Sequence, residues 1–269
     1  MALRVGNASV RAPAVAGMFY PGDPAELRGM VAQLLANAPS AAPDATPPKA
    51  LIAPHAGYVY SGSVAARAYK LIEPLRDTLR RVVVIGPSHR VYFQGIALPS
   101  ARAFGTPLGE IPIDAELARE LLSRGDVLAS DAPHAMEHSL EVQLPFLQQV
   151  LGNVTLLPLV VGVATPAFVA DVLGSVWGDE HTLVIASSDL SHYLAYEEAQ
   201  AVDARTNAQI LAMSTSLQAE QACGALPING VLGAAAQRGL RAHEIARLNS
   251  GDTAGDRARV VGYGAYALH

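Results

Sequence analysis

Three histidines in this sequence stand directly after short apolar runs, and their side chains suit metal binding or proton transfer. His55 follows "ALIAP", His89 follows "VVVIGPS", and "TLVIASS" leads to Asp189 and His192. Neutral imidazole is the commonest metal ligand in proteins and also exchanges protons near neutral pH. A lone histidine after a strand is usually a loop residue bonded to a carbonyl group. Because the same placement occurs three times, we expect one shared site.

The segments around these residues predict how the chain brings them together. Continuous apolar runs are typical of strands buried on both faces; they cover residues 50–53, 81–86, 154–162, 182–187 and 258–268, with 95–98 as a further candidate. Helical patterns lie between them, at 24–37, 61–71, 114–125, 140–151, 165–177, 196–213 and 228–238. The alternation predicts one three-layer α/β domain over residues 1–269, with a mostly parallel, mixed central sheet and helices on both faces.

This architecture explains why the three histidines are expected to converge. Parallel strands end at the same edge of the sheet, and ligand sites of open α/β sheets lie outside those carboxyl ends. The loop at residues 250–256, "SGDTAGD", is rich in turn residues and has two interpretations: it folds over the same cleft, or it is a plain hairpin connection. Asp189 has two interpretations: it caps the following helix, or it orients His192 as a supporting carboxylate.

Composition excludes several classes of protein. The chain has 269 residues, is 51% hydrophobic and 16% charged, and carries a net charge of −5, which fits a compact globular enzyme rather than a disordered chain. Its Lys and Arg residues are scattered, so we expect no nucleic-acid partner. We expect neither a signal peptide nor a membrane span, because no apolar run is long enough. The single cysteine, Cys223, excludes an internal disulfide and favours a cytoplasmic location.

Two further patterns offer competing chemistry. His134, Glu137 and His138 match H-x-x-E-H, the inverted zincin pattern, although the apolar helical periodicity begins only at Leu140. Ser88 could act as a nucleophile beside His89, but "IGPSH" lacks the G-x-S-x-G elbow of serine hydrolases. We therefore rank both below the site at the strand ends. No G-x-G-x-x-G motif supports nucleotide binding.

Seven motifs together resemble one known family. They are "AGMFYP", "APHAGYVYSG", "IGPSH", "EHSLEVQLPFL", "SSDLSHY", "CGALPI" and "SGDTAGDRARVVGYGAYAL". Their types and order are similar to those of the Memo family, whose prokaryotic members are called AmmeMemoRadiSam system protein B. That fold resembles the catalytic subunit of class III extradiol dioxygenases, which are non-haem iron enzymes. The resemblance spans residues 16–268, nearly the whole chain.

The resemblance implies a role for each matching residue. His55 and His89 occupy the two metal-histidine positions, His192 the acid/base position, and Cys223 the third ligand position. A thiolate there, in place of the carboxylate of the usual facial triad, suits zinc, copper or iron. From the residues alone, the favoured interpretation of Cys223 is a small buried apolar side chain, and only the family motif makes its role as a ligand an equal alternative.

Other residues are expected around the same cleft, among them Ser88 beside His89. The resemblance places Glu137, His138 and Glu141 near the metal histidines. Tyr58 and Tyr60 follow His55 and either touch a ligand or pack into the next helix.

These observations predict a protein that holds one transition-metal ion, with iron as the first candidate and zinc or copper as alternatives. The expected reaction is oxidation or oxygen chemistry on a small-molecule or peptide-borne substrate. Two other functions stay open: a peptide-binding module that uses the same cleft, and a zinc hydrolase with His192 or Glu141 as base. The family name implies that the protein acts in the same pathway as a radical-SAM protein and an AMMECR-type protein.

Overall fold

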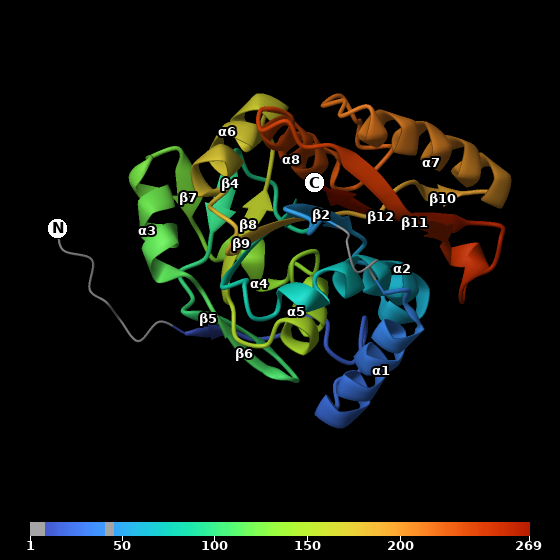
Figure 1. Cartoon of the computed structure of the whole chain (residues 1–269), viewed down its shortest axis with the longest axis horizontal. Coiled ribbons are helices and arrows are strands. Elements are labelled where there is room, and N and C mark those ends of the chain that lie inside the picture. The colour runs from blue at the N-terminus through green and yellow to red at the C-terminus, as the bar shows by residue number, and fades with distance from the viewer. Residues whose placement is uncertain (1–8, 41–45) are drawn as a thin grey trace.

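The computed structural model describes residues 9–40 and 46–269, and a nine-stranded sheet lies at its centre (Figure 1). Eight strands follow the order β10-β12-β2-β9-β3-β8-β4-β7, and β11 pairs with β12. Their bounds are β2 Ala50–Ala53, β3 Arg81–Pro87, β4 Ile96–Leu98, β7 Val127–Ala129, β8 Thr155–Val161, β9 Thr182–Ser187, β10 His192–Leu194, β11 Ala242–Asn249 and β12 Val260–Leu268. Helices cover both faces of this sheet, so the predicted three-layer α/β architecture is confirmed.

The four central strands β2, β9, β3 and β8 are parallel neighbours. Ala53 pairs with Ser187, and Ala186 pairs with Ile85, so these strands end almost level with one another. The residues that follow them therefore start from one edge of the sheet. This register is what makes it possible for distant parts of the sequence to form a single site there.

Antiparallel strands close both sides of this parallel centre. Strand β4 runs antiparallel to β8, and β12 runs antiparallel to β2, β10 and β11. The predicted mostly parallel, mixed sheet is thus confirmed. Strand β11 was not predicted, because its sequence "AHEIARLN" mixes charged and apolar residues instead of forming an apolar run.

Alternating side chains of the central strands fill two cores. In β3, Val82 and Val84 face one core, while Val83 and Ile85 face the other, as the two-residue period of a strand requires. Helices α1 (Pro24–Asn37), α2 (Tyr58–Leu71) and α5 (Leu144–Val150) cover the first face. Helices α3 (Ala115–Ser123), α6 (Pro166–Val176) and α8 (Ala225–Ala236) cover the second. Helix α7 (Tyr196–Leu211) packs against β11 and β12.

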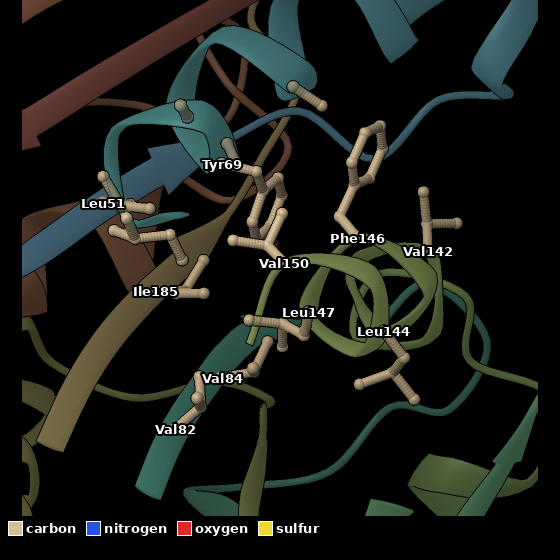
Figure 2. Packing of buried hydrophobic residues seen from close by; sticks show 14 of the residues in the cluster. Leu51, Tyr69, Val82, Val84, Val142, Leu144, Phe146, Leu147, Val150 and Ile185 are labelled. Carbon is tan, nitrogen blue, oxygen red and sulfur yellow. The ribbon is translucent and has the colours of Figure 1, made fainter. Parts of the chain in front are cut away.

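Helix α5 differs from the sequence prediction. A 3-10 turn η2 (Glu141–Gln143) precedes it, and the α-helix begins only at Leu144. Pro145 therefore lies in the first turn, where its missing N–H costs nothing, and does not bend a longer helix as expected. Figure 2 shows Leu147 and Val150 of α5 directed toward Val84 and the neighbouring strand residues of the first core.

The remaining elements complete the chain. They are β1 Val10–Arg11, β5 Ala103–Thr106 and β6 Gly109–Pro112, which form a separate three-stranded sheet, α4 Ala132–Ala135, and the 3-10 turns η1 Glu73–Leu75 and η3 Ser250–Asp252. Among the described residues, no helix combines the length and apolar character needed to cross a membrane.

Candidate metal centre

Three histidine rings meet beyond the carboxyl edge of the central strands. His55 follows β2, His89 follows β3, and His138 lies in the loop between α4 and η2. One ring nitrogen from each lies within 4.8 Å of the other two. Two ring nitrogens on one tetrahedral ion lie about 3.4 Å apart, so small ring movements would bring all three onto a single ion.

His55 is buried and is held from two sides. Its backbone N–H donates to Asp189 Oδ1 at 2.8 Å, and its Nδ1 lies 2.9 Å from Ser187 Oγ. Its Nε2 lies 3.2 Å from Cys223 Sγ. Burial, followed by the neighbouring histidines, lowers the pKa of His55 well below its ordinary value. The ring is therefore neutral near pH 7, as a metal ligand must be.

His89 is oriented by the buried carboxylate of Glu137. Oε1 of Glu137 lies 2.9 Å from His89 Nδ1, and Oε2 accepts from the backbone N–H of His89 at 2.6 Å. Burial alone would raise the pKa of Glu137, but the hydrogen bonds and charge of His89 outweigh it and lower this pKa to about 2. An ionised carboxylate on Nδ1 leaves Nε2 free, which is the usual support for a metal-bound histidine.

His138 completes the cluster through packing rather than hydrogen bonding. Its ring stacks on His89 with centroids 4.5 Å apart and lies 4.8 Å from the Phe19 ring. Burial, and then the nearby His89, lowers the pKa of His138 to about 4. Its Nδ1 lies 3.4 Å from Oε1 of the buried Glu137, without hydrogen-bond geometry. A carboxylate near one ring nitrogen leaves the other nitrogen available for a metal ion, so His138 fits the role of a ligand.

Glycine permits the close approach of the His138 loop to the sheet. A Cβ on Gly86 of β3 would lie 2.8 Å from Ser139 Oγ and 3.1 Å from Ser139 Cβ. Ser139 Oγ donates to the carbonyl of Pro87 at 3.0 Å, which fixes the loop in place.

Cys223 contacts this cluster at His55 and precedes helix α8. Burial, and then the charge of Asp189, raises the pKa of the thiol to about 12. A Cβ on Gly224 would lie 2.6 Å from Ser188 Cβ, so glycine lets this loop approach β9. The cluster thus offers imidazole nitrogen donors and one sulfur beside them. That donor set fits zinc, iron or copper. It contains no carboxylate, because the Glu137 carboxylate is hydrogen-bonded to His89.

The histidines open into a cavity of about 1300 Å³. Its walls include Tyr60, His192, Tyr193 and Cys223, and residues of α7 form one side. Residues 250 and 254–256 also line it, so this turn-rich loop borders the cleft.

Comparisons with known proteins identify the family of this chain. A family model described as Memo-like protein matches residues 11–267. The chain belongs to the Memo-like family. A MEMO1 family protein of Aquifex aeolicus is 37% identical over 94% of this chain and 97% of its own length. A MEMO1 family protein of Methanopyrus kandleri is 36% identical over 95% of this chain and 97% of its own.

A solved structure supports the fold. An uncharacterized protein of Escherichia coli K12 has a TM-score of 0.51 and 15% sequence identity, and the match covers 81% of this chain and 98% of that one. At this identity the likeness concerns the fold alone.

In this Memo-like chain, His192 lines the cavity, but its relation to Asp189 differs from the expectation. Asp189 Oδ1 accepts from the backbone N–H groups of His55 and Ala56, at 2.8 and 3.3 Å. The carboxylate therefore fixes the loop after β2 instead of orienting the His192 ring. Tyr193, next to His192, has φ of 59°, a conformation that non-glycine residues adopt mainly where the surrounding structure enforces it.

Three residues predicted to line the cleft lie elsewhere. Tyr58 is 2% exposed, and its hydroxyl donates to the carbonyl of Val142 at 2.7 Å, so it belongs to the core. Ser88 donates to the carbonyl of Val91 at 2.6 Å and lines a smaller neighbouring cavity of about 230 Å³. Tyr60, by contrast, does line the cleft.

Glu141 is the third of these corrections. It is fully buried, pairs with Arg11, and accepts from the Tyr20 hydroxyl at 2.6 Å. The backbone N–H groups of Ala14 and Val15 also donate to it. The carboxylate therefore anchors the segment before α1, and the prediction that it lines the cleft is wrong.

The H-x-x-E-H pattern does not form a zincin helix. Helix α4 ends at Ala135, so His134 and His138 do not share a helical face. His134 is buried and its Nε2 donates to the carbonyl of Ala97 at 3.0 Å. The sequence places His138 near the metal histidines but does not single it out as a candidate ligand, a role that its position in the cluster makes available. The only signal for that role was its position beside Glu137 in "EHS".

Proposed function

We propose that this chain is a transition-metal-dependent enzyme that carries out oxidation or oxygen chemistry, with iron as the first candidate ion. The observation that supports this proposal is the cluster of His55, His89 and His138 with the Cys223 thiol beside it. A redox-active ion bound there supplies Lewis acidity and electron transfer. Nitrogen and sulfur donors at one centre are compatible with iron and copper as well as zinc.

The chain's own residues would divide the remaining work. His55 and His89 hold the ion, with His138 or Cys223 as the third ligand. His192 exchanges a proton with the substrate from the wall of the cavity, since burial lowers its pKa and leaves the ring neutral as a base. Glu137 and Asp189 keep the two histidine loops in place.

The size of the cleft supports a peptide-borne substrate. Small-molecule pockets commonly enclose about 300 to 1000 Å³, and this cavity holds about 1300 Å³. We also propose a cytoplasmic location, in keeping with a single free cysteine beside a metal centre. On the family name alone, we also propose that the protein acts in the same pathway as radical-SAM and AMMECR-type proteins.

The test is to purify the protein without oxygen, measure its metal content and follow oxygen uptake. We expect one equivalent of iron in the wild type and loss of the metal in His55→Ala and His89→Ala. His243→Ala is the matched control, because His243 is exposed on β11 outside the cavity. Full metal content in both site variants would contradict the proposal.

A zinc hydrolase is the second candidate, favoured by the three nitrogen donors and the lack of a carboxylate ligand. Stoichiometric zinc without oxygen sensitivity would support it. A protein that holds no metal, and whose peptide binding survives His55→Ala, would instead support a peptide-binding module.

A further inference from the structure

A buried chain of hydrogen bonds leads from helix α2 to His55. The Tyr69 hydroxyl donates to Gln143 Oε1 at 2.7 Å, and Gln143 Nε2 donates to Ser187 Oγ at 2.7 Å. Ser187 Oγ in turn lies 2.9 Å from His55 Nδ1. Tyr69, Gln143 and Ser187 are fully buried. Tyr69 lies among the core side chains of Figure 2, with its ring stacked on Phe146 at 5.0 Å.

The direction of each bond in this chain is determined by its neighbours. The second proton of Gln143 Nε2 reaches the carbonyl of Pro54 at 3.0 Å, and that oxygen can only accept. The amide therefore cannot be reversed without placing its own oxygen against the Pro54 carbonyl. Gln143 must donate to Ser187, and Tyr69 must donate to Gln143.

The hydrogen bonds of the Ser187 hydroxyl are directed by its neighbours in the same way. Its single proton goes to the carbonyl of Ser139 at 2.5 Å, which again can only accept. Toward His55, Ser187 Oγ can therefore act only as an acceptor, and His55 Nδ1 must carry a proton. The neutral ring then has an unprotonated Nε2, and this nitrogen is the one beside Cys223 Sγ.

We infer that Ser187, Gln143 and Tyr69 are positioning residues that hold His55 in the Nδ1–H tautomer, so that its Nε2 is always ready to bind a metal ion. This inference rests on the proposed metal centre. Supporting groups of this kind fix the tautomer of a ligand histidine, and their loss commonly lowers metal affinity 10- to 100-fold. None of the three residues touches the ion itself.

The tautomer can be measured directly in the metal-free protein. We expect ¹⁵N NMR of the wild-type imidazole rings, assigned with a His55→Gln variant, to show a protonated Nδ1 and a bare Nε2 at His55. In Ser187→Ala the acceptor is gone, and the proton is expected to move largely to Nε2. Titration with zinc alone should then show an affinity about 10- to 100-fold lower than that of the wild type.

Matched variants separate this effect from a loss of packing. Thr182→Val is the control for Ser187→Ala, because Thr182 is buried at the other end of the same strand β9. Tyr69→Phe acts through Gln143 and should weaken zinc binding by a few fold. Tyr266→Phe removes a buried hydroxyl for which the described residues provide no partner, and should leave binding unchanged.

The outcomes distinguish this inference from the proposed function. If wild-type protein does not bind zinc, iron or copper, the metal centre is wrong, and the NMR measurement alone decides the tautomer. If wild-type protein binds zinc, and Ser187→Ala keeps both its tautomer and its affinity, the inference is overturned. Should Ser187→Ala fail to fold, the comparison of Tyr69→Phe with Tyr266→Phe gives the answer, and equal zinc affinities would overturn the inference.

Discussion

The carboxylate of Glu137 accepts hydrogen bonds from both the ring and the backbone of His89, at 2.9 and 2.6 Å. It also accepts from the backbone N–H of Ser139 at 2.8 Å, in the loop that carries His138. A single buried acid thus connects two of the three clustered histidines. The orientation of His89 and the position of the His138 loop depend on the same side chain.

Glu137→Gln should therefore lower metal affinity. All three partners of the carboxylate are donors, so the NH₂ group of a glutamine would face at least one of them. We expect zinc affinity to fall about 10- to 100-fold, measured by calorimetric titration. Glu110→Gln changes an exposed acid that pairs with Arg102 and serves as the control. Equal affinities of Glu137→Gln and wild type would show that the carboxylate does not support the ligand.

The pH dependence of metal affinity should identify the third ligand. Burial raises the pKa of the Cys223 thiol to about 12, so an ion that binds its thiolate must displace a proton. The apparent affinity would then rise about tenfold per pH unit between pH 7 and 8. The pKa values of His55 and His138 lie below this range and add little to the slope.

Cys223→Ser gives the matching measurement, because a serine hydroxyl stays protonated near neutral pH. If Cys223 is a ligand, the slope should be lost in Cys223→Ser and the affinity should fall. Parallel pH curves for the two proteins would instead assign the third position to His138. In that case His138→Ala should abolish binding.

Glu141→Ala should destabilise the fold without emptying the metal centre. The substitution leaves Arg11 buried without its partner, and breaking a buried ion pair in this way costs about 3 to 5 kcal/mol. Chemical denaturation measures the loss, with the exposed Glu110→Ala as a control expected to change stability by less than about 0.5 kcal/mol. Loss of metal from a folded, otherwise stable Glu141→Ala protein would contradict the structural role assigned here.

The buried His134 should make the metal-free protein less stable in acid. Burial lowers its pKa from 6.5 to about 4. Between these values the unfolded chain binds a proton that the folded protein excludes, so the free energy of unfolding falls as pH falls. This contribution is fully present above pH 6.5, and its loss by pH 4 amounts to about 3 kcal/mol. His138 adds a change of the same sign.

His134→Gln removes this titration while keeping a donor for the Ala97 carbonyl. Its stability should fall less steeply than that of the wild type between pH 6.5 and 4.5, as measured by thermal unfolding with a chelator present. Equal slopes for the two proteins would rule out His134 as a cause of the acid sensitivity.

The sequence alone determined the central strands of the sheet and the edge at which the site forms. Apolar runs end just before His55, His89 and Asp189, and parallel strands must end on one side, so convergence followed from local pattern and topology. Helical patterns between the strands also predicted where the covering helices lie. These features depend on short stretches of chain, where burial and residue type are directly linked.

Only the tertiary structure decided the partner of each polar side chain. Glu141 looked like a cleft residue, yet it meets Arg11, 130 positions away. His138 lies in the cluster because its loop packs against Gly86. Asp189 accepts a hydrogen bond from the backbone of His55 and does not orient His192. A sequence pattern records how strongly a residue prefers burial, but hydrogen-bond partners depend on which distant segments pack together. For that reason the sequence could locate the site, while the ligand set and its supporting contacts required the fold.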